Sequence, residues 1–235
     1  MNGIQAAASA LDGYQRRQEA IAHNLANANT VGFKRILVTL SSSRPDGGPG
    51  ATEAPPVVQV REGVDFRQGD LVRTGAPLDL ALDGEGLFAV ETPAGERYTR
   101  AGNFQRNAEG LLVTPSGHPV LGEGGSPIRL GDGALDEVRV DSSGRVAAPG
   151  GSVRLRLVKF PPATLLPAGE GLFRPRAGAS PEPAEVAVRQ GYRERSNANP
   201  IDELLGLIEV QRSFEAAQRS VQAALRTLER TSDLV

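Results

Sequence analysis

The sequence of 235 residues contains no cysteine and no tryptophan, and it has only two histidines. The lack of cysteine excludes disulfides and thiolate metal ligands. His23 falls in a predicted helix and His118 in a Gly-Pro turn, so the two histidines do not predict a metal site. A strong charge of one sign is also lacking, because 26 basic and 28 acidic residues leave a net charge of −2. We therefore expect no general attraction to nucleic acid or to an anionic membrane.

Long hydrophobic runs are missing as well. No stretch approaches the roughly 20 apolar residues that span a bilayer, so no membrane insertion is predicted. Residues 1–22 have neither a basic start nor an unbroken apolar core, which argues against a cleaved secretory signal peptide. If such a chain leaves the cytoplasm, we expect it to use a route that does not read a peptide of that kind.

Recognisable catalytic motifs are absent from the sequence. There is no G-x-S-x-G nucleophile elbow and no EF-hand spacing. The Gly-Glu-Gly of residues 84–86 precedes a strand-like segment, 87–90, where a dinucleotide site needs a helix, so we interpret it as a hairpin turn. Asp79 and Asp83 alternate with leucines on a predicted strand and are expected to face solvent. We assign no catalytic, cofactor-binding or metal-binding residue, and we predict that the protein is not an enzyme and needs no cofactor.

Helical periodicity is present at both ends of the chain. Residues 4–28 follow an a/d heptad pattern, with a stripe comprising Ile4, Leu11, Tyr14, Ile21 and Leu25. Near the other end, Asn199 is a candidate N-cap and Pro200 fits the first helical position. The stripe that follows comprises Leu207, Val210, Phe214, Ala217, Val221 and Leu228. Each stripe is longer than a small β domain is wide, so we expect it to be covered by the other terminal helix or by helices of neighbouring copies.

The middle of the chain is rich in turns and in alternating sequence. There are 28 glycines and 17 prolines, and between residues 57 and 190 apolar and polar residues alternate with a period of two. This pattern predicts half-buried antiparallel strands. The expected fold class is α+β, with long N- and C-terminal helices pairing as a coiled coil and an antiparallel all-β domain inserted between them. The expected parts are an N-terminal assembly helix and signature (1–35), a linker (36–60), an all-β outer domain (61–192) and a C-terminal assembly helix (193–235).

One segment carries a specific motif. Residues 24–34 read Asn-Leu-Ala-Asn-Ala-Asn-Thr-Val-Gly-Phe-Lys. They resemble the N-terminal signature of the flagellar rod and hook proteins, N-L-A-N-x-x-T-x-G-[FY]-K, at every fixed position. The matching residues are Asn24, Leu25, Ala26, Asn27, Thr30, Gly32, Phe33 and Lys34. Because Asn24 and Asn27 share one helix face, we expect them to cap the helix end, to bond neighbouring helices, or to do both.

Further blocks extend the resemblance over nearly the whole chain. Residues 74–88 are similar to the family block T-G-x-P-L-D-x-A-x-x-G-x-G-[FL]-F, and the motif of residues 98–104 follows in the expected place. Glu194, Ser196 and Asn197 match the E-x-S-N that leads into the C-terminal helix, and residues 211–215 match its Q-R-x-[FY]-E core. The pair Tyr192-Arg193 departs from the small or aliphatic residues common there. Segments 125–128 and 171–173 look more like those of proximal rod subunits, with the distal rod subunit as the alternative.

The resemblance implies a structural subunit of the bacterial flagellar basal-body rod, which polymerises into a helical tube and transmits torque from motor to hook. Implied partners are other copies, other rod proteins, the flagellar export apparatus and surrounding ring proteins, with no nucleic acid and no membrane insertion. The implied location is the rod where it crosses the periplasm. On this hypothesis, deletion of residues 1–35 or 200–235 abolishes incorporation and leaves the β domain folded. The alternatives are a helix-dimerised β-rich binding module and a secreted enzyme that acts on the cell wall.

Overall fold

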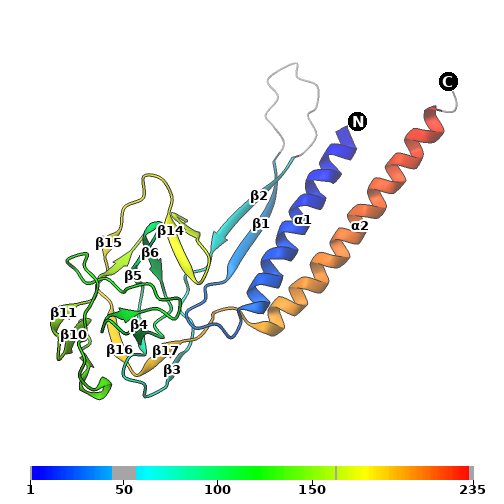
Figure 1. Cartoon of the computed structure of the whole chain (residues 1–235). Coiled ribbons are helices and arrows are strands. Elements are labelled where there is room, and N and C mark those ends of the chain that lie inside the picture. Colours follow the sequence, from blue (N-terminus) through cyan, green and yellow to red (C-terminus); the bar gives the residue numbers. More distant parts are fainter. Residues whose placement is uncertain (1, 44–56, 162, 233–235) are drawn as a thin grey trace. The chain divides into compact units, whose positions relative to one another are not determined.

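The computed structural model describes residues 2–43, 57–161 and 163–232 (Figure 1). The linker predicted over residues 36–60 therefore lies partly outside the described residues. The chain divides into two compact units. The helical unit comprises Met1–Ala26, Ile36–Gly63 and Asn199–Val235, and the β unit comprises Asn27–Arg35 and Val64–Ala198.

The helical unit consists of two long helices and one strand pair. Helix α1 spans Asn2–Ala26 and α2 spans Pro200–Ser232, while β1 (Ile36–Ser43) pairs with β2 (Val57–Val64). Helix α1 contacts both α2 and β1. The start of α2 is defined by Asn199, whose side-chain Oδ1 accepts a hydrogen bond from the backbone N–H of Ile201 at 3.0 Å. Neither described helix combines the length and apolarity needed to cross a membrane.

The predicted fold class, in which the terminal helices pair as a coiled coil, is wrong. The described residues are β-rich, with seventeen strands (β1–β17) and only two α-helices, and they do not show a coiled coil. A coiled coil buries both stripe positions on both helices along their length. Among the described side chains of α2, only Glu203 and Val210 are buried, and α1 also packs on β1.

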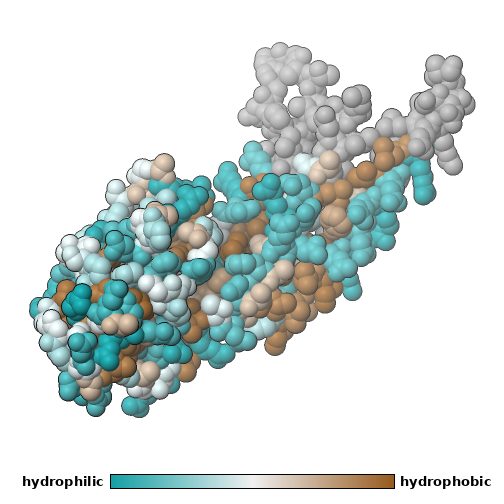
Figure 2. Space-filling model, viewed as in Figure 1, coloured by the Kyte–Doolittle hydropathy of each residue, from teal (hydrophilic) through white to brown (hydrophobic). Residues whose placement is uncertain are grey.

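A second apolar stripe on α2 supplies the physical reason for this correction. Ile201, Leu204, Leu205 and Ile208 follow the i, i+3, i+4, i+7 spacing of one helix face, yet they are 48–68% exposed. Figure 2 shows the corresponding hydrophobic surface over the first turns of α2. Apolar residues thus cover a wider part of the α2 surface than the single stripe that the heptad pattern predicts.

The β unit is built from antiparallel strand pairs. Its largest sheet has six strands in the order β13-β14-β6-β5-β12-β15, and a three-stranded sheet has the order β11-β10-β9. The strands of the six-stranded sheet are β5 (Leu87–Thr92), β6 (Gly95–Thr99), β12 (Leu157–Lys159), β13 (Leu165–Pro167), β14 (Leu172–Pro175) and β15 (Glu182–Pro183). The three-stranded sheet contains β9 (Arg139–Val140), β10 (Arg145–Ala148) and β11 (Gly151–Arg154), preceded by a short 3-10 helix, η1 (Leu135–Glu137).

Three further strand pairs complete the β unit. They are β3–β17, β4–β16 and β7–β8, formed by β3 (Leu71–Arg73), β17 (Tyr192–Glu194), β4 (Leu80–Asp83), β16 (Ala187–Gln190), β7 (Gln105–Arg106) and β8 (Leu112–Val113). The pairs β3–β17 and β4–β16 join the beginning of the β unit to its end in sequence. Strands that are far apart in the sequence therefore pair and hold the β unit together.

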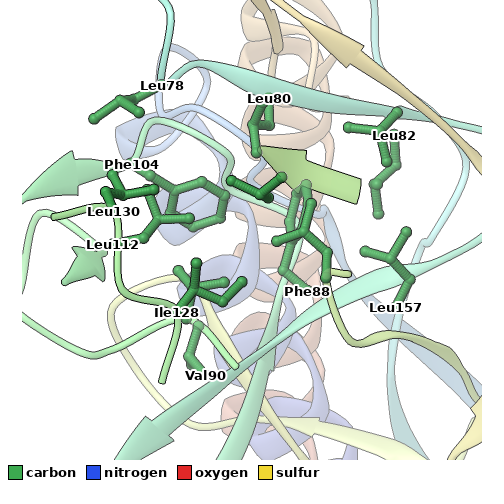
Figure 3. Close-up of a cluster of buried hydrophobic side chains, with 14 of the residues drawn as sticks. Leu78, Leu80, Leu82, Phe88, Val90, Phe104, Leu112, Ile128, Leu130 and Leu157 are labelled. Carbon is green, nitrogen blue, oxygen red and sulfur yellow. The ribbon is translucent and has the colours of Figure 1, made fainter. Parts of the chain in front are cut away.

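The main core lies between the sheets of the β unit (Figure 3). Phe88 and Phe104 meet edge to face, with ring centroids 5.0 Å apart. Leu80 and Leu82 of β4 point into the same cluster. Gly102 permits this packing, because a Cβ added there would lie 1.6 Å from the Leu80 carbonyl oxygen. On the other face of β5, Leu87 and Ala89 belong to a second cluster. Strand β5 is consequently buried on both faces.

Two expectations for β4 and the residue before it are wrong. Strand β4 pairs with β16 and not with β5, so residues 84–86 do not close a hairpin. Asp79 is 1% exposed and not solvated; its carboxylate accepts a hydrogen bond from the Thr74 hydroxyl and forms an ion pair with Arg193 at 2.7 Å. Arg193, one of the two residues that depart from the family pattern, thus compensates a buried carboxylate.

Candidate functional site

The signature segment follows directly from α1 and passes from the helical unit into the β unit. Within the helical unit, the Asn24 side chain is buried and pairs with the backbone of Ile36. Its Nδ2 donates to the Ile36 carbonyl oxygen at 2.9 Å, and its Oδ1 accepts from the Ile36 N–H at 2.8 Å. The same Nδ2 lies 3.3 Å from Oε2 of Glu203 on α2. Asn24 therefore fixes three elements of the helical unit, α1, β1 and α2, at one point.

The next residues of the signature form a tight turn in the β unit. The Thr30 N–H donates to the Asn27 carbonyl oxygen at 3.0 Å, and the Thr30 hydroxyl donates to the Asn27 side chain at 3.1 Å. Gly32 has a φ of +65°, and a Cβ added to it would lie 2.4 Å from the Ala101 backbone nitrogen. Only glycine fits both the left-handed backbone and this close approach.

Lys34 ends the signature inside a buried charge cluster. Its Nζ donates to Glu194 Oε1 and to the Arg67 carbonyl oxygen, both at 2.6 Å. The guanidinium of Arg100 binds the other carboxylate oxygen of Glu194, and the Gly69 N–H donates to Oε1 at 2.9 Å. The Lys34 and Glu194 side chains are each 1% exposed, and that of Arg100 is 4% exposed. We call Lys34, Arg100 and Glu194 the charge cluster.

The charge cluster holds two cations on one carboxylate. Backbone carbonyls accept the remaining donors, since Arg100 also binds Gly86 O and Leu82 O. Burial lowers the pKa of the Lys34 ammonium, and the Glu194 carboxylate opposes that shift. Such a cluster is stable only while its anion is in place, because a buried charge left alone is costly.

Asn197 forms a second set of hydrogen bonds between the N-terminal and C-terminal parts of the β unit. Its Oδ1 accepts from the Arg35 N–H at 2.8 Å, and its Nδ2 donates to the carbonyl oxygens of Asp65 and Arg67 at 2.8 and 2.9 Å. Ser196 caps the following turn by accepting from the Ala198 N–H at 3.2 Å. Within the E-x-S-N block, Glu194 therefore binds Lys34 of the N-terminal signature, and Asn197 binds Arg35, the residue that follows it.

The predicted helix stripes are brought together only in part. Ile21 and Val210 are buried, whereas the other described members are half-buried: Leu11, Tyr14, Leu25, Leu207, Phe214, Ala217 and Val221. The side chains of Ile4 and Leu228 lie outside the described part. Of the remaining signature residues, Phe33 is buried, Leu25 is half-buried and Ala26 is exposed.

Sequence reasoning missed several residues of this site. Arg100 and Glu194 stand in family blocks that give them no individual role, and Glu203, which is fully buried, lies in none of these blocks. Among the residues that the structure describes, no group of three or more His, Asp or Glu could hold a metal ion. His118 Nε2 instead lies 3.4 Å from Glu170 Oε2.

Comparison with known proteins identifies the class to which the chain belongs. Residues 4–34 match the family model described as flagella basal body rod protein. Residues 81–148 match the flagellar hook protein FlgE/F/G D1 domain, and residues 189–234 match the flagellar basal body rod FlgEFG protein C-terminal model. The three matches contain Lys34, Arg100 and Glu194, one in each. The three matches thus place the chain in the class of flagellar rod and hook proteins.

Similarity to individual relatives identifies the family within this class. The chain is 36% identical to the flagellar basal-body rod protein FlgF of Caulobacter vibrioides, over 87% of this chain and 86% of the relative. It is 34% identical to FlgF of Rhizobium meliloti, over 98% and 95% of the two chains. It is 32% identical to FlgG of Caulobacter vibrioides, over 100% and 99%. The chain belongs to the family of flagellar basal-body rod proteins, which are structural proteins of the basal body.

Proposed function

We propose that copies of this chain associate with one another and with other rod proteins into a helical tube that transmits torque from motor to hook. The chain has no catalytic role in this proposal. Its segments 1–35 and 193–235 serve assembly, and 61–192 faces outward. It reaches the rod, where the rod crosses the periplasm, through the flagellar export apparatus and without a cleaved signal peptide, and ring proteins surround it there. Membership of the rod family supports each of these points.

The observation that carries the proposal is the exposed stripe Ile201, Leu204, Leu205 and Ile208. Isolated apolar side chains are common on protein surfaces, but four on one helix face form a contiguous patch. Fully burying one such side chain contributes about 1.5–3 kcal/mol. Because these side chains are already about half buried, covering the stripe would contribute roughly 4 kcal/mol in all. That is too little for a stable dimer but is useful when many contacts repeat in a lattice.

We further propose a proximal position in the rod, as for FlgF. The identities to the two FlgF relatives, 36% and 34%, exceed the 32% identity to FlgG. A distal position, as for FlgG, is the alternative. Labelling the chain in isolated basal bodies with gold-conjugated antibody separates the two, because a label beyond the proximal rod would contradict the FlgF-like assignment.

The experiment that tests assembly replaces Leu204 and Leu205 by Gln in a strain that lacks the chromosomal copy. We expect loss of the subunit from isolated basal bodies and loss of motility. The purified variant should keep its thermal unfolding temperature within a few degrees, because both side chains are exposed in the free subunit.

The matched control replaces Val72 and Leu135 by Gln. These residues are exposed to a similar degree, 42% and 37%, but they lie on the β unit. The control should assemble normally. Normal assembly of the Leu204/Leu205 variant would contradict the proposal, as would equal loss in the control.

A further inference from the structure

Three arginines lie on the outer face of the three-stranded sheet β11-β10-β9. Arg145 of β10 is directly opposite Arg154 of β11, and Arg139 of β9 is opposite Ala147, two residues along β10. Residues two apart on a strand point to the same side, so the three arginines share one face. We call Arg139, Arg145 and Arg154 the arginine face.

The other side of the same sheet belongs to the core. Val146 is buried there, and Val140, Ala148 and Val153 pack against the same cluster. The arginines therefore cannot turn inward, and all three are exposed. The residues between them on the outer face, Ala147 and Ser152, are too small to shield them.

Neighbouring carboxylates neutralise this face only weakly. Arg154 is 3.4 Å from Glu123, and both side chains are largely exposed. The Asp141 carboxylate is occupied by the Ser143 hydroxyl and by the backbone N–H groups of Ser143 and Arg145. Within the described ranges, Arg139 and Arg145 form no ion pair. Like charges directly opposite each other on a sheet are unfavourable, so the arginine pair does not stabilise the fold.

We propose that the arginine face binds an acidic protein surface. Guanidinium groups pair with carboxylates through two parallel hydrogen bonds, and exposed charges of one sign steer a complementary partner into register. The face consists of side chains on a sheet, whereas phosphate sites commonly surround the anion with backbone N–H groups. A row of guanidinium groups of this kind suits carboxylates presented by another folded protein. The proposal does not depend on the α2 stripe, because the arginine face lies on the β unit.

The test measures binding of the full chain to fluorescently labelled poly-L-glutamate in low-salt buffer. The variant Arg139→Gln/Arg145→Gln/Arg154→Gln should bind at least about tenfold more weakly, because three charge pairs are lost. The matched control is Arg73→Gln/Arg174→Gln/Arg176→Gln, which removes the same net charge from exposed arginines outside the face. It should stay within about threefold of the natural chain.

Three outcomes would overturn the proposal. Equal loss in both triple variants would show that net charge alone governs binding. Binding to phosphatidylglycerol vesicles through the arginine face, without binding to poly-L-glutamate, would assign the face to lipid. A clear fall in the unfolding temperature of Arg145→Gln alone would show that the arginine pair is structural; we expect that temperature to stay the same or to rise.

Discussion

Substitutions of different members of the charge cluster are expected to lower the stability of the protein by different amounts. Replacing Glu194 by Gln keeps the shape of the side chain but removes the carboxylate of the charge cluster, so Lys34 and Arg100 remain as two buried cations. Replacing Lys34 by Met leaves the Arg100–Glu194 pair, which is neutral as a whole. We therefore expect Glu194→Gln to be the more damaging change, although both substitutions break the same contact of 2.6 Å.

The magnitudes follow from the burial of the cluster. Breaking a buried ion pair by removing one partner costs about 3–5 kcal/mol, and we expect that range for Glu194→Gln. Lys34→Met loses two hydrogen bonds but leaves the Glu194 carboxylate paired with Arg100. We therefore expect this variant to lose about 1–2 kcal/mol of stability. For a protein of this size, 1 kcal/mol lowers the unfolding temperature by about 2–4 °C. The two variants should then differ by several degrees.

The assay is urea and thermal unfolding followed by far-ultraviolet circular dichroism, because the chain has no tryptophan to report fluorescence. Arg189→Gln is the control: it breaks an ion pair to Asp83 whose side chains are 52% and 39% exposed. We expect less than about 1 kcal/mol for that change. A Glu194→Gln variant no less stable than Arg189→Gln, or one more stable than Lys34→Met, would refute the reasoning.

Three further predictions concern the β unit. Gly102→Ala should cost several kcal/mol in unfolding experiments, because the new methyl group would overlap the Leu80 carbonyl oxygen, and an unchanged unfolding temperature would contradict that packing. Arg67 hydrogen-bonds the Asp65 carboxylate and lowers its pKa, so Asp65 adds stability above about pH 4 that is lost as the pH falls through the lowered value. The stability difference between the natural chain and Asp65→Asn should shrink from pH 6 to pH 2, and a constant difference would show that the pKa is not lowered. Deletion of residues 1–26 should leave the β unit folded in circular dichroism, whereas deletion of 1–35 should unfold it, and folded protein from both deletions would contradict the assignment of 27–35 to the β unit.

That last prediction revises an expectation from sequence. The signature looked like the end of a helix, and its removal was expected to spare the β domain. In the structure, Gly32 packs on Ala101, and Lys34 reaches Glu194. The two ends of the β unit meet there, so a stretch that looks terminal in sequence is internal to the fold.

Features that depend on residues close together in the sequence could be predicted. Asn199 and Pro200 begin α2 through local capping chemistry, and the signature segment indicated the family without any structure. The alternating pattern of residues 57–190 likewise predicts antiparallel strands, and β5 and β6 pair in that way. These signals act over a few residues, which is the range that a sequence pattern reports well.

Features that depend on distant partners could not be predicted. Asp79 alternates with leucines and therefore looked solvent-facing, but Thr74 and Arg193 bury and neutralise it. Glu194 lies 160 residues from Lys34, and no spacing rule connects them. The second stripe on α2 was overlooked because the heptad pattern was fitted to one face, although Ile201 and Leu204 begin another. Asp79 stands out as a charged residue among leucines, but that pattern does not identify its partners.

Electron cryomicroscopy of basal bodies that contain this chain tests the central claim most directly. We predict that the stripe of Ile201, Leu204, Leu205 and Ile208 is covered by a neighbouring subunit in the assembled rod. A rod in which the chain is present and these four side chains remain exposed to solvent would contradict the account.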